Sequence, residues 1–219
     1  MCEPASFVVT KKQVFWSKNT ESHHEIITEF QLKEQNVRKE YNLVCVEITP
    51  PDGDFTKPFS KWTYHLDTGG YDREKPNWYD AVDVEKRCRM HLKDWRKAKV
   101  VMPNQSIESI NLGQIIAIYG TVNDISGGTV KYIRGGTVEY IYGGTVEYIY
   151  GGTVNDIRGG TVNNIRGGTV KYYRGNFPDR VSGNAIVINY GSLTPEILKS
   201  CDAVMIDRSN KIVKCFTGR

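Results

Sequence analysis

The chain has 219 residues, of which 39% are hydrophobic and 25% are charged, so it is long enough for one domain or two small ones and is not disordered by composition. Its net charge of +4 is spread thinly, with 17 basic and 16 acidic side chains in residues 1–102 and 12 and 9 in residues 103–219. These values exclude the dense basic field of a dedicated duplex-DNA binder, and the chain is not acidic enough to mimic DNA.

The first residues lack a basic segment followed by an apolar run, and the chain has no apolar segment of membrane-spanning length. Its five cysteines are odd in number, widely spaced and free of CxxC pairs, which is typical of reduced thiols rather than of disulfides or a zinc site. We therefore expect a cytoplasmic protein with no signal peptide, no membrane partner, no cofactor and no metal.

Residues 1–102 are predicted to form an α+β domain in the order strand, strand, helix, strand, strand, helix. The first two strands turn at Lys11-Lys12, and the first helix begins after Ser22 with Glu25 completing a capping box. An apolar strand over 42–50 and a second strand over 61–67 follow, separated by a turn-rich loop. The last helix covers 79–100, and its apolar face consists of Val84, Cys88, His91, Leu92 and Trp95.

Several polar residues of this domain could carry chemistry, but each has a simpler structural interpretation. His23 and His24 point in different directions from a helix and are expected to be exposed at its start. His65 and Asp67 share one face of a strand and could act as an acid–base pair, although a structural role is favoured. His91 is expected to be a hydrogen-bonded core histidine.

Short motifs do not change this interpretation. Asp80, Asp83 and Glu85 lie at a helix start, where the helix dipole favours negative charge. The single Asp-Thr-Gly triplet in "LDTGGYD" is too little for an aspartic protease, which needs two such triplets. Asp52 and Asp54 fit a turn better than a calcium-binding loop. The sequence contains no P-loop, GxSxG or HExxH motif. We therefore assign no catalytic residue.

From Gly120 to Gly175 the chain repeats the unit Gly-Thr-Val-x-x-Ile-x-Gly seven times, the last copy with Tyr173 in place of Ile, and degenerate copies lie on both sides. Paired glycines every eight residues exclude a helix, and Thr, Val and Ile favour extended structure. Val and Ile lie three residues apart, so only a bend between them lets both point inward. The pattern predicts a β-solenoid over 103–191, with two octads (16 residues) per coil, about five coils and an undetermined hand.

The predicted interior is filled by the Val and Ile of each octad, and the glycines are expected at corners that need a positive φ or close backbone approach. Residues 192–219 are predicted to cap the last coil, with a helix that begins at Thr194-Pro195 and a hairpin that turns at Ser209-Asn210. The α+β domain is expected to cap the first coil.

The octads differ mainly beside the Ile, where stacked coils would align Tyr and Arg side chains into ladders. Such ladders suit contact with a protein, with single-stranded nucleic acid or with sugar-phosphate, although they could also simply coat and stabilise the sheet. The candidate binding residues are Tyr132, Arg134, Tyr140, Tyr142, Tyr148, Tyr150, Arg158, Arg166, Tyr172 and Arg174.

The stretches "VEITPPDGDFTKPFSKWTYHLD" and "WYDAVDVEKRCRMHLKDW", together with the octads, resemble a group of uncharacterised phage, prophage and gut-bacterial proteins with GTVxxI repeats. The similarity covers most of the chain, in the PPDGD, WYD and EKRCR stretches and in the repeat. It implies a β-solenoid and an intracellular phage or mobile-element setting, and it transfers no functional residue. The paired glycines depart from the Gly-Asn-Gly or Asn-Gly corner expected in that group.

Taken together, these features predict a non-enzymatic binding protein, encoded by a phage or mobile element, that engages and inhibits a macromolecule of the bacterial host, such as a defence component. One alternative is a nucleic-acid binder that uses the Tyr/Arg ladders. Another is a small enzyme in the N-terminal domain, with His65, Asp67 and His91 as its candidates. Self-association also stays open.

Overall fold

The computed structural model describes residues 4–36, 38, 40–68, 75–193, 202–209 and 214–217. The chain divides into two compact units, Met1–Ala98 and Lys99–Arg219. The predicted fold class is confirmed, because the chain is mainly β and combines an N-terminal α+β unit with a β-solenoid of about six turns over residues 100–207. Within the described ranges, no helix is both long and apolar enough to cross a membrane.

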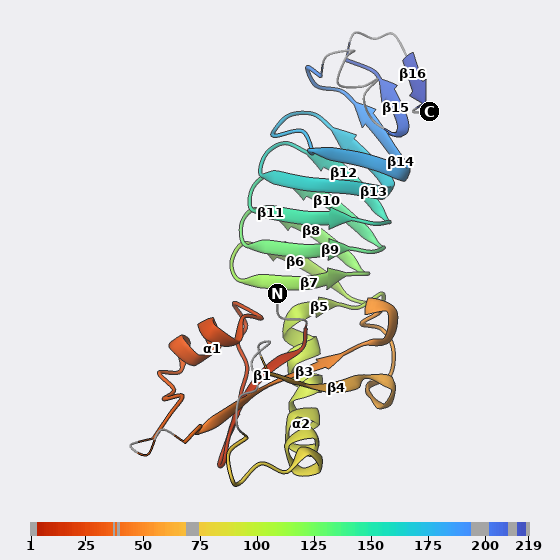
Figure 1. Ribbon diagram of the computed structural model, residues 1–219. Coiled ribbons are helices and arrows are strands. Elements are labelled where there is room, and N and C mark those ends of the chain that lie inside the picture. Colours follow the sequence, from red (N-terminus) through yellow and green to blue (C-terminus); the bar gives the residue numbers. More distant parts are fainter. Residues whose placement is uncertain are drawn as a thin grey trace. The chain divides into compact units, whose positions relative to one another are not determined.

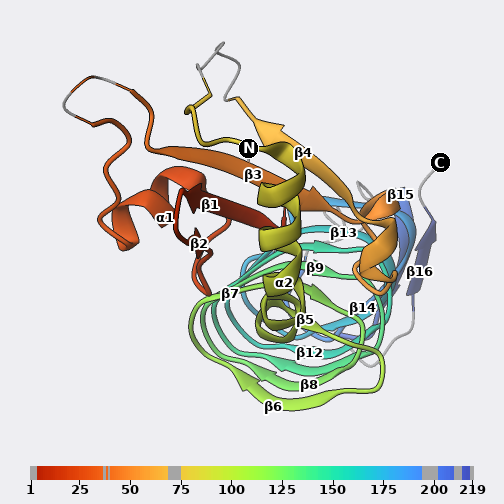
Figure 2. The ribbon, with the colours of Figure 1, turned by 90° about the horizontal axis from the view of Figure 1, so that it is seen from below.

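The N-terminal unit has the predicted element order. Its four strands form an antiparallel sheet in the order β2-β1-β3-β4 (Figure 2). The backbone N–H of Thr10 donates to the carbonyl of Gln13 and closes the predicted turn between β1 and β2. The elements are β1 (Ser6–Thr10), β2 (Val14–Phe15), α1 (His23–Glu29), β3 (Leu43–Thr49), the short 3-10 helices η1 (Pro51–Gly53) and η2 (Phe59–Lys61), β4 (Thr63–Asp67) and α2 (Ala81–Lys99).

Both helices of this unit begin at the capping residues that the sequence indicates. At the start of α1, the hydroxyl of Ser22 accepts a hydrogen bond from the backbone N–H of Glu25. At the start of α2, the carboxylate of Asp80 accepts one from the N–H of Asp83 at 2.8 Å. Each cap satisfies a backbone donor that the first turn of a helix leaves unpaired.

The apolar residues of the unit gather against the sheet. Ile26 and Ile27 of α1 pack with Val8, Leu43 and Cys45. The buried face of α2 carries four of the five predicted residues, whereas His91 is only half-buried at its margin. These four are Val84, Cys88, Leu92 and Trp95.

The solenoid consists of two columns of parallel strands, as Figures 1 and 2 show. Consecutive octads alternate between the columns, and Thr121 pairs with Thr137, which lies sixteen residues later. This register confirms two octads per coil. One column contains β5 (Val100–Val101), β7 (Gln114–Ile118), β9 (Thr129–Ile133), β11 (Thr145–Ile149) and the first half of β13 (Thr161–Tyr172). The other contains β6 (Ser106–Ile110), β8 (Thr121–Ile125), β10 (Thr137–Ile141), β12 (Thr153–Ile157) and the second half of β13.

The predicted bend within each octad is present. In the pairing of β8 with β10, Val122 meets Val138 and Ile125 meets Ile141, while the residue after each Val is skipped. All four of these side chains are fully buried. The bend therefore turns both apolar positions of the octad into one continuous core that runs along the solenoid.

Glycine is required at most corner positions for one of two reasons. Gly136 has a φ of +67°, in the left-handed region that side chains rarely adopt, and a Cβ there would collide with the carbonyl oxygen of Gly120. Gly143 has no positive φ, but a Cβ would collide with the carbonyl oxygen of Ser126 in the coil below. The paired glycines thus allow both the turn and the close stacking of coils.

The stack is longer than the predicted 103–191. At its start, β5 already pairs with β7, so the solenoid begins at residue 100. At its end, β14 (Arg180–Asn189) is parallel to β13, and β15 (Asp202–Asp207) is parallel to β14. The predicted C-terminal hairpin is confirmed as β15 and β16 (Lys214–Thr217), but its first strand extends the parallel stack. The helix predicted at Thr194 and the turn residue Asn210 lie outside the described residues.

Candidate functional site

The candidate surface arises because most octads place the same two positions, before and after the Ile, on the outside of the coil. Each side chain then lies near its counterparts sixteen residues before and after it in the same column, as Tyr132 does above Tyr148. Alternate octads belong to different columns, so the predicted Tyr/Arg ladder is divided into two patches rather than forming one. This division corrects the expectation of a single patch.

The β11 patch consists of Tyr132, Arg134, Tyr148, Tyr150 and Arg166. The two tyrosines Tyr132 and Tyr148 lie on β9 and β11, Arg134 and Tyr150 directly follow these strands, and Arg166 lies within β13. Its three rings contact one another, with centroids 5.6–5.9 Å apart. The guanidinium of Arg134 lies 5.0 Å from the ring centroid of Tyr132, and that of Arg166 lies 5.3 Å from the centroid of Tyr148. These are cation–π distances, so the five side chains hold one another in place.

The β10 patch consists of Tyr140, Tyr142, Arg158, Tyr173 and Arg174 on the other column. Tyr140 and Tyr142 are stacked at 5.3 Å with nearly parallel planes, and both are more than one-third exposed. The guanidinium of Arg158 lies within 6 Å of the rings of Tyr140 and Tyr173. This patch is therefore also ordered by contacts among its own side chains.

One predicted binding residue is not on the surface. Tyr172 is buried in the solenoid core, where it pairs with Ile157 across a register shift and packs edge-on against Phe177. Tyr173, which the octad pattern would place inside, is exposed instead and stacks on Tyr190 at 4.8 Å. A bulge in the last regular octad exchanges the two tyrosines, so Tyr172 is withdrawn from the candidate surface.

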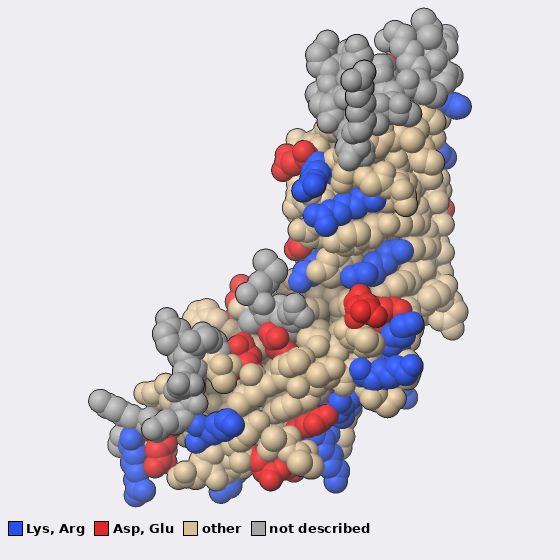
Figure 3. All heavy atoms as spheres, turned by 45° about the vertical axis from the view of Figure 1, so that its right-hand side comes forward, with Lys and Arg blue, Asp and Glu red and all other residues tan. Residues whose placement is uncertain are grey.

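The two patches differ in their electrostatic surroundings. Beside the β10 patch, Asp156 accepts from Arg158 at 2.7 Å, and a ladder runs from Lys171 through Asn155 to Glu139. Asp156 and Arg158 thus form an ion pair, while Lys171 and Glu139 are linked through the side-chain amide of Asn155. The five residues of the β11 patch, like those of the β10 patch, include two arginines and no acidic residue, and Glu147 lies on β11 next to Tyr148. On the face shown in Figure 3, basic side chains of the solenoid are scattered among uncharged surface rather than gathered in a dense field.

In the N-terminal unit, the predicted catalytic candidates are not brought together. His65 is exposed on β4, and His91 is half-buried on α2. Asp67 does not pair with His65 but with His23, whose Nδ1 atom lies 2.9 Å from an Asp67 carboxylate oxygen. His23 is 5% exposed, so the expectation that it is exposed at the start of α1 is wrong, whereas His24 is exposed as expected.

Sequence reasoning also missed Glu47, which lies close to this pair. The only group of three or more His, Cys, Asp and Glu ligand atoms among the described residues is formed by His23, Glu47 and Asp67. A signal was present, because Glu47 is a half-buried charged residue in the mostly apolar strand β3. Its nearness to His23 could not be found from the sequence, because 24 residues separate the two.

Comparison of the chain with protein-family models, with curated proteins and with solved structures gives no match.

Proposed function

We propose that this protein is a non-enzymatic binding protein that uses the β11 patch to contact a protein partner. The observation that carries the proposal is the arrangement of three tyrosines and two arginines that contact one another within about 6 Å on a rigid stack of coils. Tyr and Arg are enriched among the residues that contribute most to protein–protein binding.

The order of the patch lowers the cost of binding. A side chain that is immobilised only on association loses conformational entropy at that moment, which opposes binding. Here the rings of Tyr148 and Tyr150 are already stacked at 13°, and Arg166 already lies near both of them. The patch therefore resembles the rigid aromatic surfaces of preorganised binding sites.

A protein partner is favoured over single-stranded nucleic acid. Nucleic-acid binding by stacking needs free ring faces beside a basic groove that follows the phosphates. In the β11 patch the rings contact one another and the guanidiniums lie over rings, so fewer faces are available to bases. The excess of basic over acidic side chains in this patch instead suits a protein surface with acidic residues.

The resemblance to phage and prophage proteins gives the most specific version of the proposal. The partner would then be a cytoplasmic macromolecule of a bacterial host, such as a defence component, and binding would inhibit it. This version rests on sequence similarity in the PPDGD, WYD and EKRCR stretches and in the octads.

An affinity capture experiment with matched variants tests the proposal. The full chain at micromolar concentration is used as bait in a bacterial lysate, beside a Tyr150→Ala/Arg134→Ala variant of the β11 patch. A Tyr142→Ala/Arg158→Ala variant of the β10 patch serves as control. We expect a protein that is retained by the unmodified chain and by the control and is reduced at least tenfold by the β11 variant.

Two results would contradict the proposal. One is the absence of any retained protein while thermal unfolding shows that all baits are folded. The other is a gel shift of single-stranded DNA or RNA that weakens steeply with salt and on substitution of Arg166, since that dependence identifies phosphate contacts. The second result would establish the nucleic-acid alternative.

A further inference from the structure

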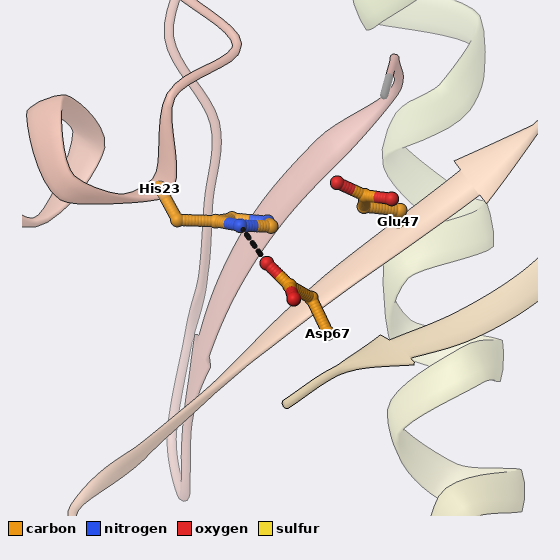
Figure 4. A group of neighbouring side chains, drawn as sticks. All are labelled: His23, Glu47 and Asp67. Atoms are coloured by element: carbon orange, nitrogen blue, oxygen red, sulfur yellow. Dashed lines mark hydrogen bonds and ion pairs between the residues drawn. The ribbon is translucent and has the colours of Figure 1, made fainter. Parts of the chain in front are cut away.

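Three side chains from separate elements converge in the N-terminal unit, as Figure 4 shows. His23 is the first residue of α1, Glu47 belongs to β3 and Asp67 ends β4. One potential ligand atom from each of them lies within 4.8 Å of the other two. Glu47 pairs with His65 and Asp67 pairs with Cys45 across the β3–β4 ladder, so the two carboxylates are diagonal neighbours on one face of the sheet.

The ring of His23 is oriented as in many metal-binding histidines. Its Nε2 atom lies 3.1 Å from the backbone carbonyl oxygen of Val46, which can only accept a hydrogen bond. An Nε2–H donor at this contact leaves Nδ1 as the nitrogen that can carry a lone pair in the neutral ring. Nδ1 is the atom that faces Asp67.

The charges of the group favour a cation between the three residues. Two carboxylates close together on one face of a sheet repel each other, and the side chain of Asp67 is only 31% exposed while that of His23 is 6% exposed. A divalent ion bound to a neutral imidazole and two carboxylates gives a neutral site.

A cavity beside Asp67 provides room for a further ligand. Its volume is about 20 Å³, and its lining includes Tyr41, Cys45, Asp67 and Lys75 but neither His23 nor Glu47. That volume accommodates roughly one water molecule. A metal held by three protein atoms commonly completes its coordination with water.

We propose that Nδ1 of His23 and one carboxylate oxygen each of Glu47 and Asp67 bind a divalent first-row transition metal, with water as a fourth ligand. One nitrogen and two oxygen ligands suit Zn²⁺ or Mn²⁺ better than Ca²⁺, which prefers oxygen alone. The ion would connect the start of α1 to β3 and β4. This inference is independent of the proposed function of the solenoid.

The test is isothermal titration calorimetry, in which Zn²⁺, Mn²⁺ or Ca²⁺ is added to the metal-free full chain and the affinity and stoichiometry of binding are measured. The variants are Glu47→Gln and Asp67→Asn, because the side-chain amide of the second can still hydrogen-bond to Nδ1 of His23 and preserves a purely structural contact. The control is His65→Ala, which removes an exposed histidine two residues from Asp67 on the same strand.

We expect one equivalent of Zn²⁺ or Mn²⁺ to bind the unmodified chain and the His65→Ala control equally, with much weaker binding of Ca²⁺. Each carboxamide variant should lose at least tenfold in affinity while its circular dichroism stays unchanged. Co²⁺, used as a coloured substitute, should show visible absorption bands that both variants lose. The proposal is overturned if the unmodified chain binds no metal at millimolar concentration, or if the variants bind as tightly as the unmodified chain. Either result leaves His23 and Asp67 as a hydrogen-bonded pair that fixes α1.

Discussion

Two adjacent glycines, Gly135 and Gly136, form one corner of the solenoid but differ in whether a side chain could be accommodated there. A Cβ at Gly135 would have its nearest neighbour at 3.8 Å, in ordinary contact with the carbonyl oxygen of Tyr119. A Cβ at Gly136 would collide with the backbone of Gly120, and its φ of +67° adds strain. Gly136→Ala should therefore lower the free energy of unfolding by about 1–3 kcal/mol, whereas Gly135→Ala should change it by about 0.5 kcal/mol or less.

Urea unfolding of the two variants measures this difference. Because the substitutions are chemically identical and one residue apart, helix or strand propensity cannot account for unequal losses. Equal losses would contradict the corner geometry described above.

Cys88 should make the stability of the N-terminal unit decrease at alkaline pH. Its complete burial in the face of α2 raises the pKa of its thiol to about 12. The unfolded chain loses this proton above pH about 8.5, so deprotonation favours unfolding between the two pKa values, by at most about 1.4 kcal/mol per pH unit. Burial, followed by the hydrogen bond with Tyr79, also raises the pKa of Tyr64 in the same unit.

Urea unfolding at pH 7.5 and pH 10, monitored by Trp fluorescence, measures this loss. Cys88→Ala should be less stable than the unmodified chain at pH 7.5, and the gap between them should narrow at pH 10. If the two chains differ in free energy of unfolding by the same amount at both pH values, the thiol of Cys88 does not contribute to the loss of stability at alkaline pH.

Residues with local roles could be predicted from the sequence, and those with distant partners could not. The inward Val and Ile, the corner glycines and the caps at Ser22 and Asp80 follow from spacing and side-chain chemistry. The burial of His23 depends on Asp67, which is 44 residues away and is brought near it only by the sheet. Tyr172 was misplaced because a one-residue register shift reverses which tyrosine points inward.

The 16-residue register between stacked strands predicts which deletions the solenoid tolerates. Thr121, Thr137 and Thr153 are stacked in consecutive coils of one column. Deleting residues 137–152 removes one complete coil and joins equivalent positions, so the shortened chain should fold with the same β-type circular dichroism. Its melting temperature should fall only slightly, because stability in a solenoid is roughly a sum over neighbouring repeats.

The control is deletion of residues 137–148, which also begins at Thr137 but ends inside an octad. It brings Ile149 next to Gly136 and shifts the Val and Ile positions out of the core. This variant should unfold at a much lower temperature or aggregate. Equal melting temperatures for the two deletions would contradict the 16-residue coil.

The columns also show which features of the candidate site the repeat determined. The alignment of Tyr and Arg beside the Ile follows directly from stacked octads. Because octads alternate between columns, Tyr140 and Tyr142 are separated from Tyr148 and Tyr150. The membership of the two patches is defined by contacts between rings and guanidiniums, which the sequence does not show. The extension of the stack by β15 could not be predicted, because its sequence lacks the octad pattern.

At the scale of the whole molecule, the repeat supplies the scaffold and the variable positions supply the candidate binding surface. The near-identity of the octads follows from the need of each coil to match the next one. The expectation that the N-terminal domain caps the first coil stays a prediction. The proposed metal site and the proposed binding surface lie in different units, so each can be removed by substitution without altering the residues of the other.

Site-specific photocrosslinking in living bacteria tests the central claim most directly. A benzophenone-bearing amino acid replaces Tyr150 in the β11 patch or, as control, Tyr142 in the β10 patch, since both follow the Ile of an octad and are exposed to a similar extent. We predict a discrete crosslinked protein of one mass from position 150 that is absent from position 142. No crosslink at either position, or the same products at both, would contradict a specific protein contact at the β11 patch.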